Sequence, residues 1–213
     1  YLRNLQQRRD EVKSAIEAQG KLTDELARSI DNAATLAEVE DLYRPYKQKR
    51  RTRATVAKEK GLEPLADAIF AQDRNGKAPE ELAKDFLNPD LGVETIEDAL
   101  SGASDIIAER ISDDAELRKS LRARMQKSAL CESKAAKEDE DSVYRLYYDF
   151  HQLVSKLQSH QVLALNRGEK EGFLSVTVLL DRVAALDKVR RAVVKSGSAA
   201  SAFVSAACED AYD

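Results

Sequence analysis

The sequence is short of cysteine, histidine and long apolar runs, and each shortage excludes a class of protein. Its only two cysteines, Cys131 and Cys208, lie far apart and lack the spacing of metal ligands. A disulfide framework is therefore not expected, and a reducing cytoplasm suits this cysteine usage. No stretch approaches the roughly 18 apolar residues of a membrane span, and residues 1–4 lack the apolar core of a signal peptide.

Signatures of catalysis and metal binding are also missing. His151 and His160 are nine residues apart, so they would lie on different faces of one helix, and neither has a carboxylate or cysteine at a standard ligand offset. Residues 139–141 are consecutive acids whose side chains would splay around the backbone. The chain contains no GxxxxGK[ST], GxGxxG, HExxH or GxSxG motif. We therefore expect a non-enzymatic protein with no catalytic residue, no metal site and no cofactor.

The composition predicts a mainly all-α fold. Eight glycines and four prolines are too few for an all-β protein with many tight turns, and 43% apolar with 34% charged residues suits a helical protein with a solvated surface. Successive helical patterns differ in length and show no repeat, which indicates an irregular multi-helix array. The segment FLSVTVLL is almost continuously apolar and rich in β-branched residues, so it predicts one minor strand near 173–180.

Local signals predict a helix-turn-helix-like pair over residues 53–72. Thr52 is placed to cap a short helix that ends at Lys60, Gly61 supplies a left-handed turn, and a second helix begins at Glu63-Pro64. Such pairs are abundant in helical proteins, so plain structural packing is the alternative to nucleic-acid recognition.

Two further stop and start signals concern the neighbouring helices. Pro45 is expected to stop the helix that precedes the pair, because it disfavours helical geometry at Arg44. Asp113 and Glu116 are expected to form the capping pair of a helix that runs to about residue 130.

The chain is expected to divide at an acidic connector. We predict an N-terminal helical array over 1–130, an exposed connector over 131–141, and a second helical subdomain with one strand over 142–213. The chain begins without Met and stops inside a helical pattern, so we expect a fragment that is truncated at its C-terminal end.

The best candidate site is a basic segment over residues 43–53, in a chain whose net charge is −4. Six of its eleven residues are basic, and no acid follows until Glu59. The candidate nucleic-acid-binding residues are Arg44, Tyr46, Lys47, Lys49, Arg50, Arg51 and Arg53. Arginine and lysine grip phosphate, and tyrosine can stack on bases.

Three interpretations of the basic segment stay open. It contacts RNA or DNA, it pairs with acids elsewhere in the fold or on a partner protein, or it is simply solvated at a helix terminus. Residues 71–150 carry a net charge of −7 and could supply the internal acids. The aromatic group Tyr144, Tyr147, Tyr148 and Phe150 could also stack on bases, but burial in a second small core is favoured.

Two long blocks carry a family resemblance. They are EDLYRPYKQKRRTRATVAKEKGLEPLA over residues 40–66 and SHQVLALNRGEKEGFLSV over 159–176. Both resemble the bacterial transcription accessory protein Tex family, which has PYK, a K-R-R-T run, GLEPLA and an SH…LA..RGE..G.L segment. The chain departs from the family pattern at His151-Gln152, where Glu-Pro is frequent, and at Gln158, where Pro is frequent.

The resemblance implies a part of a multidomain transcription factor. Tex proteins have an N-terminal helical array, an RNase-H-like domain, a helix-hairpin-helix region and a C-terminal OB-type RNA-binding domain, so this chain would be the N-terminal helical portion. It would act in the cytoplasm, bind nucleic acid and associate with RNA polymerase or other transcription proteins. The alternative is a non-catalytic scaffold that positions binding domains outside this chain.

Overall fold

The computed structural model describes residues 1–47, 51–136 and 142–212. Lys49 and Arg50 of the basic segment and residues 137–141 of the predicted connector therefore lie outside the described residues. The chain forms two compact units, the first made of Tyr1–Lys119 with Leu186–Asp213 and the second of Ser120–Ala185. Within the described part of the chain, no helix is both long and apolar enough to cross a membrane.

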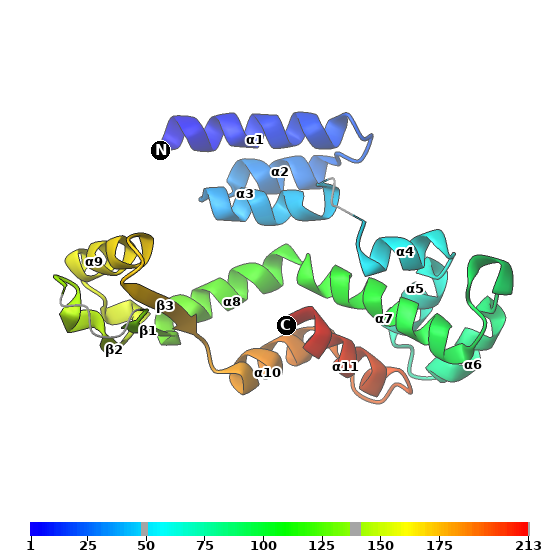
Figure 1. Cartoon of the computed structure of the whole chain (residues 1–213). Helices are drawn as coiled ribbons and strands as arrows, with labels where there is room; N and C mark the ends of the chain where they lie inside the picture. The colour runs from blue at the N-terminus through cyan, green and yellow to red at the C-terminus, as the bar shows by residue number, and fades with distance from the viewer. Residues whose placement is uncertain (48–50, 137–141, 213) are drawn as a thin grey trace. The chain divides into compact units, whose positions relative to one another are not determined.

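The prediction of a mainly helical fold with a minor strand element is confirmed (Figure 1). The α-helices are α1 (Leu2–Glu17), α2 (Asp24–Asn32), α3 (Leu36–Tyr43), α4 (Arg53–Glu59), α5 (Glu63–Ala71), α6 (Pro79–Ala83), α7 (Ile96–Ser112), α8 (Ala115–Ser128), α9 (Ser159–Lys170), α10 (Arg182–Val193) and α11 (Ser201–Tyr212). The strands are β1 (Leu130–Ala135), β2 (Asp149–Leu153) and β3 (Leu174–Leu179). Short 3-10 turns include η1 (Arg44–Tyr46) and η4 (Arg145–Tyr147).

Helices α1, α2 and α3 pack together because each carries an apolar stripe at helical spacing. Their shared core is built from Leu5, Val12, Ile16, Ile30, Ala33 and Val39, with Tyr43 and Tyr46 packed against it. The hydroxyl of Thr23 accepts a hydrogen bond from the backbone of Leu26, and Thr35 does the same for Glu38, so side chains satisfy amides at both helix starts.

Helix α7 is the centre of the first unit, since α4, α5, α6 and α11 all pack against it. Small residues allow these close contacts. A Cβ atom added at Gly102 would lie 2.4 Å from Cδ1 of Leu62 and 3.2 Å from Cβ of Ala57. Leu62, at the start of α5, therefore occupies the space above a residue that has no side chain.

The two helices of the predicted helix-turn-helix-like pair form as expected. Thr52 accepts a hydrogen bond from the backbone of Thr55 at 3.1 Å, and Gly61 has a φ of +78°. Both helices pack against α7, and each has buried residues. A recognition role for α5 stays a prediction. Helix α3 ends at Tyr43, as the stop signal at Pro45 predicts, but Arg44 keeps helical angles (φ −51°, ψ −43°), so the expected reason for the stop is wrong.

The second unit contains an antiparallel sheet in the order β2-β1-β3. Strand β3 confirms the prediction near 173–180, and β1 supplies its hydrogen-bond partner. The predicted connector is wrong for residues 131–135, because they form the central strand of this sheet. Cys131 and Ser133 point inward and are buried, whereas Glu132 and Lys134 alternate with them on the other face.

Burial of the tyrosine cluster is confirmed. Tyr144 belongs to the core of the second unit, and Tyr147, Tyr148 and Phe150 pack against that core. The Tyr144 and Phe173 ring centroids are 5.8 Å apart. The edge-to-face pair of Tyr147 and Phe150 has a centroid distance of 5.3 Å. Tyr144 is buried and the other three rings are half-buried, so the cluster mainly serves internal packing.

We expect the cap of α7 to make folding stability fall in acid. Thr95 accepts from the backbone of Asp98 at 3.1 Å, and Asp98 accepts from the backbone of Thr95 at 3.0 Å. Hydrogen bonds to the Asp98 carboxylate from the side chain and the backbone of Thr95 lower the pKa of Asp98. A carboxyl group whose pKa is lower in the folded state stabilises the protein above its unfolded pKa, and this contribution is lost as pH falls through the folded pKa.

The melting temperature of the wild type should therefore fall more steeply below about pH 4 than that of Asp98→Asn. Circular dichroism melts at pH 7, 5, 4 and 3 measure this difference. Glu97→Gln, in the same helical turn, is the matched control and should keep the wild-type slope. Parallel curves for wild type and Asp98→Asn would contradict the assignment.

Candidate nucleic-acid interface and an adjoining cleft

Arg44, the first arginine of the basic segment, is paired inside the fold. Its Nε donates to Oδ1 of Asp113 at 2.8 Å, and only 10% of the Asp113 side chain is exposed. The expectation that Asp113 caps α8 is wrong by one residue, because Asp114 accepts from the backbone of Leu117 at 2.8 Å. Asp113 is thus available for the arginine of a different helix.

Arg51 and Arg53 are also bound to carboxylates. Nη2 of Arg51 lies 2.6 Å from Oε2 of Glu59, on the surface. Nη2 of Arg53 donates to Oδ2 of Asp210 at 2.9 Å, and its Nε lies 3.3 Å from Oδ1 of Asp105. Arg53 therefore connects the start of α4 to both α7 and α11.

The ion pairs of Arg53 with Asp105 and Asp210 are unevenly buried, and this affects the pKa values of the groups. Only 18% of the Asp105 side chain is exposed, against 72% of that of Arg53. Burial raises the pKa of Asp105, although the charge of Arg53 acts in the opposite direction. The hydrogen bond to Asp210 raises the pKa of Arg53. The guanidinium is thus a fixed cation that offsets two carboxylates.

Tyr46 and Lys47 lie at the end of η1. The Tyr46 ring packs against the core of α1, α2 and α3, and its carbonyl accepts a hydrogen bond from Nε2 of Gln19 at 2.9 Å. The Tyr46 ring is therefore committed to internal packing. Lys47 is exposed, and among the described cations of the basic segment it alone has no carboxylate partner.

The structure thus brings the described arginines of the segment to acids, as one of the three interpretations predicts. Contact of the segment with nucleic acid stays a prediction. Sequence reasoning missed the individual partners Asp105, Asp113 and Asp210. No local signal could have found them, because Arg44 and Asp113 are separated by 69 residues and Arg53 and Asp210 by 157.

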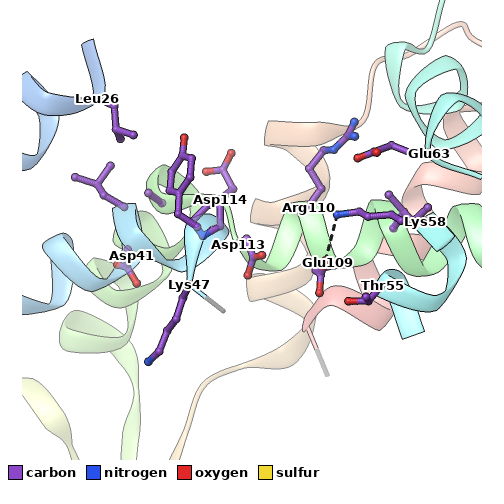
Figure 2. A pocket seen from close by; sticks show the side chains of 15 residues that line it. Leu26, Asp41, Lys47, Thr55, Lys58, Glu63, Glu109, Arg110, Asp113 and Asp114 are labelled. Atoms are coloured by element: carbon purple, nitrogen blue, oxygen red, sulfur yellow. Dashed lines mark ion pairs between the residues drawn. The ribbon is translucent and has the colours of Figure 1, made fainter. Parts of the chain in front are cut away.

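A cleft of about 560 Å³ adjoins the basic segment in the first unit (Figure 2). Its apolar lining includes Leu26, Leu42, Pro45 and Ile106, and its charged lining comprises Asp41, Lys47, Lys58, Glu63, Glu109, Arg110, Asp113 and Asp114. Figure 2 shows Lys58 turned towards Glu109, and the Nζ to Oε2 distance is 3.6 Å. Lys47 extends away from Asp113 and Asp114 in the same view. Among the described lining residues, acids outnumber bases, which makes this part of the cleft less favourable for a polyanion.

Most charges of the cleft are satisfied within the fold. Arg118 donates to Asp41 at 2.8 Å, and Arg110 donates to Asp67 at 2.6 Å. Thr52 donates to Glu109 at 3.0 Å. These contacts join different helices of the first unit. The paired charges around the cleft therefore help to hold these helices together.

Candidate metal ligands and the two thiols are dispersed over the described residues. Within residues 1–47, 51–136 and 142–212, no group of three or more His, Cys, Asp and Glu is placed to hold a metal ion. Cys131 and Cys208 are buried thiols, and burial raises the pKa of each. A thiol with a raised pKa is a poor nucleophile at neutral pH. The absence of enzymatic function stays a prediction.

The sequence of the chain matches a known protein family and several known proteins. Residues 74–211 match a family model described as Tex central region-like. The chain is 48% identical over 183 residues to the uncharacterized protein YdcI of Bacillus subtilis, covering 84% of this chain and 25% of that protein. It is 38% identical over 180 residues to the transcriptional accessory protein Tex of Neisseria gonorrhoeae, covering 84% and 23%.

A more distant human protein also matches. The S1 RNA-binding domain-containing protein 1 of Homo sapiens is 29% identical over 198 residues, which cover 83% of this chain and 19% of that protein. The chain thus spans a quarter or less of the length of these curated relatives.

Proposed function

The chain belongs to the Tex family, and from this premise we propose that it is a non-catalytic helical scaffold within a cytoplasmic transcription accessory protein. The matched family model describes the central region, whereas the sequence resemblance implied the N-terminal helical portion. The name of the Neisseria relative supports a role in transcription. Its partners would be RNA polymerase or other transcription proteins, which the scaffold would meet through its surface.

The pairing of the basic segment carries this proposal. Arg44, Arg51 and Arg53 each contact a carboxylate, and Arg53 joins three helices. Binding of a phosphate would have to compete with carboxylates that are already in place. The human relative is named for an S1 RNA-binding domain, and this chain covers only 19% of that protein. That name alone therefore does not assign RNA binding to the region that this chain matches.

A titration of the whole chain against nucleic acid tests the scaffold proposal. Fluorescence anisotropy with labelled 30-nucleotide RNA, single-stranded DNA and duplex DNA in 150 mM KCl should give no saturable binding tighter than about 100 µM. Non-specific nucleic-acid binders reach about 1–100 µM under these conditions. Tighter, salt-sensitive binding to any of the three would overturn the scaffold proposal in favour of the second candidate.

The second candidate is RNA or DNA binding through the basic segment. It is favoured by the exposure of Lys47 and by side chains of Arg51 and Arg53 that remain 67% and 72% exposed. With about four to six phosphate contacts, the slope of log K against log salt should be about −4 to −5. The triple substitution of Arg50, Arg51 and Arg53 by Ala should weaken binding to all sequences and make the slope shallower.

The matched control for this triple variant removes three exposed lysines outside the segment. The substitutions Lys21→Ala, Lys77→Ala and Lys84→Ala change the net charge by the same amount. If the basic segment binds nucleic acid, the control variant should bind it with wild-type affinity. An equal loss in both variants would show that net charge alone, rather than the basic segment, governs the interaction.

A further inference from the structure

The second unit exposes large apolar side chains close to one another. Val143 is 86% exposed and Leu163 is 58% exposed, and both line a hollow of about 370 Å³. Tyr144 and Ala164 complete its apolar lining, and His160 and Arg167 supply its polar groups. We call these six residues the apolar hollow. Exposed apolar surface that polar residues surround is typical of interaction sites.

The floor of the hollow is held in place by the core of the second unit. The Tyr144 ring packs against Phe173, and its Cδ1 lies close to Gly168, 3.1 Å from where a Cβ atom on that residue would be. The Tyr144 hydroxyl donates to Oε2 of Glu171 at 2.9 Å. Tyr144 is 7% exposed, so it offers no free ring face to stack on a base.

The polar side chains of the hollow have no partner among the described residues. Arg167 and His160 are exposed residues of α9, and the described part of the chain provides neither with a hydrogen-bond or ion-pair partner for its side chain. Among the described residues no carboxylate lines the hollow, and Glu171 is engaged by Tyr144. The described lining of the hollow therefore combines aliphatic walls with one arginine cation and an imidazole that can donate a hydrogen bond.

We propose that the apolar hollow is a docking site for a partner protein segment that presents a bulky apolar side chain beside a carboxylate. The apolar side chain would lie between Val143 and Leu163, and the carboxylate would pair with Arg167 in bidentate geometry. A nucleic acid is a poorer match, because the hollow has a single arginine and aliphatic walls. The partner segment would therefore be recognised by charge complementarity together with burial of its apolar side chain.

This inference deepens the proposed scaffold function and rests on it. The test uses the whole ¹⁵N-labelled chain and a labelled octapeptide in which Phe and Leu are flanked by Asp and Glu. The amide signals of residues 143–147 and of α9 should shift on titration, and anisotropy should give saturable binding. Leu163→Ser and Arg167→Glu should each weaken binding about tenfold. Both residues are exposed, so the fold should tolerate the changes.

Matched controls lie on the same unit. Val183→Ser removes an apolar side chain that is 70% exposed, and Lys156→Glu reverses an exposed charge outside the hollow. Both should leave the peptide affinity unchanged. A charge-reversed peptide, with Lys in place of Asp and Glu, should bind at least about tenfold more weakly than the acidic peptide.

Several outcomes would overturn the docking proposal. They are equal binding of both peptides, no shifts at millimolar peptide, or shifts of the same residues by RNA that displaces the peptide. A dimer in sedimentation that Leu163→Ser dissociates would assign the hollow to a second copy of the chain and overturn it too. The scaffold proposal fails separately, by nucleic-acid binding that depends on the basic segment and leaves the apolar hollow unchanged.

Discussion

The substitution Leu62→Ala is expected to lower the free energy of unfolding of the first unit by about 2–5 kcal/mol. Leu62 is fully buried, and its Cδ1 fills the space above Gly102, which has no side chain to move into a void. The loss therefore combines the transfer of apolar atoms with a cavity between α5 and α7 that the surrounding residues cannot close. Urea unfolding followed by circular dichroism measures the change.

The control for this experiment is Leu87→Ala, at a leucine that is 41% exposed. It should cost less than about 1 kcal/mol, because little apolar area is lost. Adding Gly102→Ala to Leu62→Ala should recover part of the stability, since the new methyl group enters the vacated space. Equal shifts of the urea midpoint for Leu62→Ala and Leu87→Ala would contradict this account of the packing.

The second large effect is expected for Leu174→Ala in the second unit. Leu174 is 2% exposed and shares a small core with Cys131, Tyr144 and Leu165. A loss of about 2–5 kcal/mol is a large fraction of what such a small core supplies. Hydrogen exchange of the β1–β3 amides should accelerate at least about 30-fold, which corresponds to about 2 kcal/mol. Amides of α4, α5 and α7 should keep their protection.

Two companion variants make this test decisive. Thr177→Ala changes an exposed position of the same strand and should leave exchange unchanged. Gly168→Ala alone should destabilise the sheet, because its Cβ would lie 2.5 Å from Cδ1 of Leu174. In the Leu174→Ala background that clash is absent, so the two effects should not add. Simple additivity, or loss of protection throughout α7, would contradict the local packing described above.

The features that could be predicted from the sequence are those whose interacting atoms are close along the chain. Thr52 caps a helix through an amide three residues away, and Gly61 takes a left-handed conformation that glycine favours. The β-branched run at 176–178 predicts a strand without reference to its partner. These local rules suffice to place α4, α5 and β3.

Strand β1 could not be recognised for a physical reason. Its inward positions are Cys131 and Ser133, which are small, and its outward positions include Glu132 and Lys134. The segment therefore lacks the apolar alternation by which strands are recognised. It becomes a strand because β2 and β3 supply hydrogen-bond partners on both sides. Those partners lie 14 or more residues away in the sequence.

The environment of the basic segment was only partly predictable. Charge counting indicates that residues 71–150 hold the excess acid, and Asp105 and Asp113 do come from that section. Asp210 lies outside it, and its contact with Arg53 depends on the packing of α11 against α7. A count of charges gives the sign of a partner, but only the fold determines which carboxylate reaches which guanidinium.

The contribution of α11 to the surroundings of Arg53 has a practical consequence. A shortened version of the chain that stops before Ser201 would lose the Asp210 carboxylate together with the apolar side chains that α11 buries against α7. Arg53 would then keep only Asp105, and aliphatic surface of α7 would be open to solvent. Such a piece would adhere to polyanions and self-associate more readily than the whole chain, so affinities measured with it would overstate the role of Arg53.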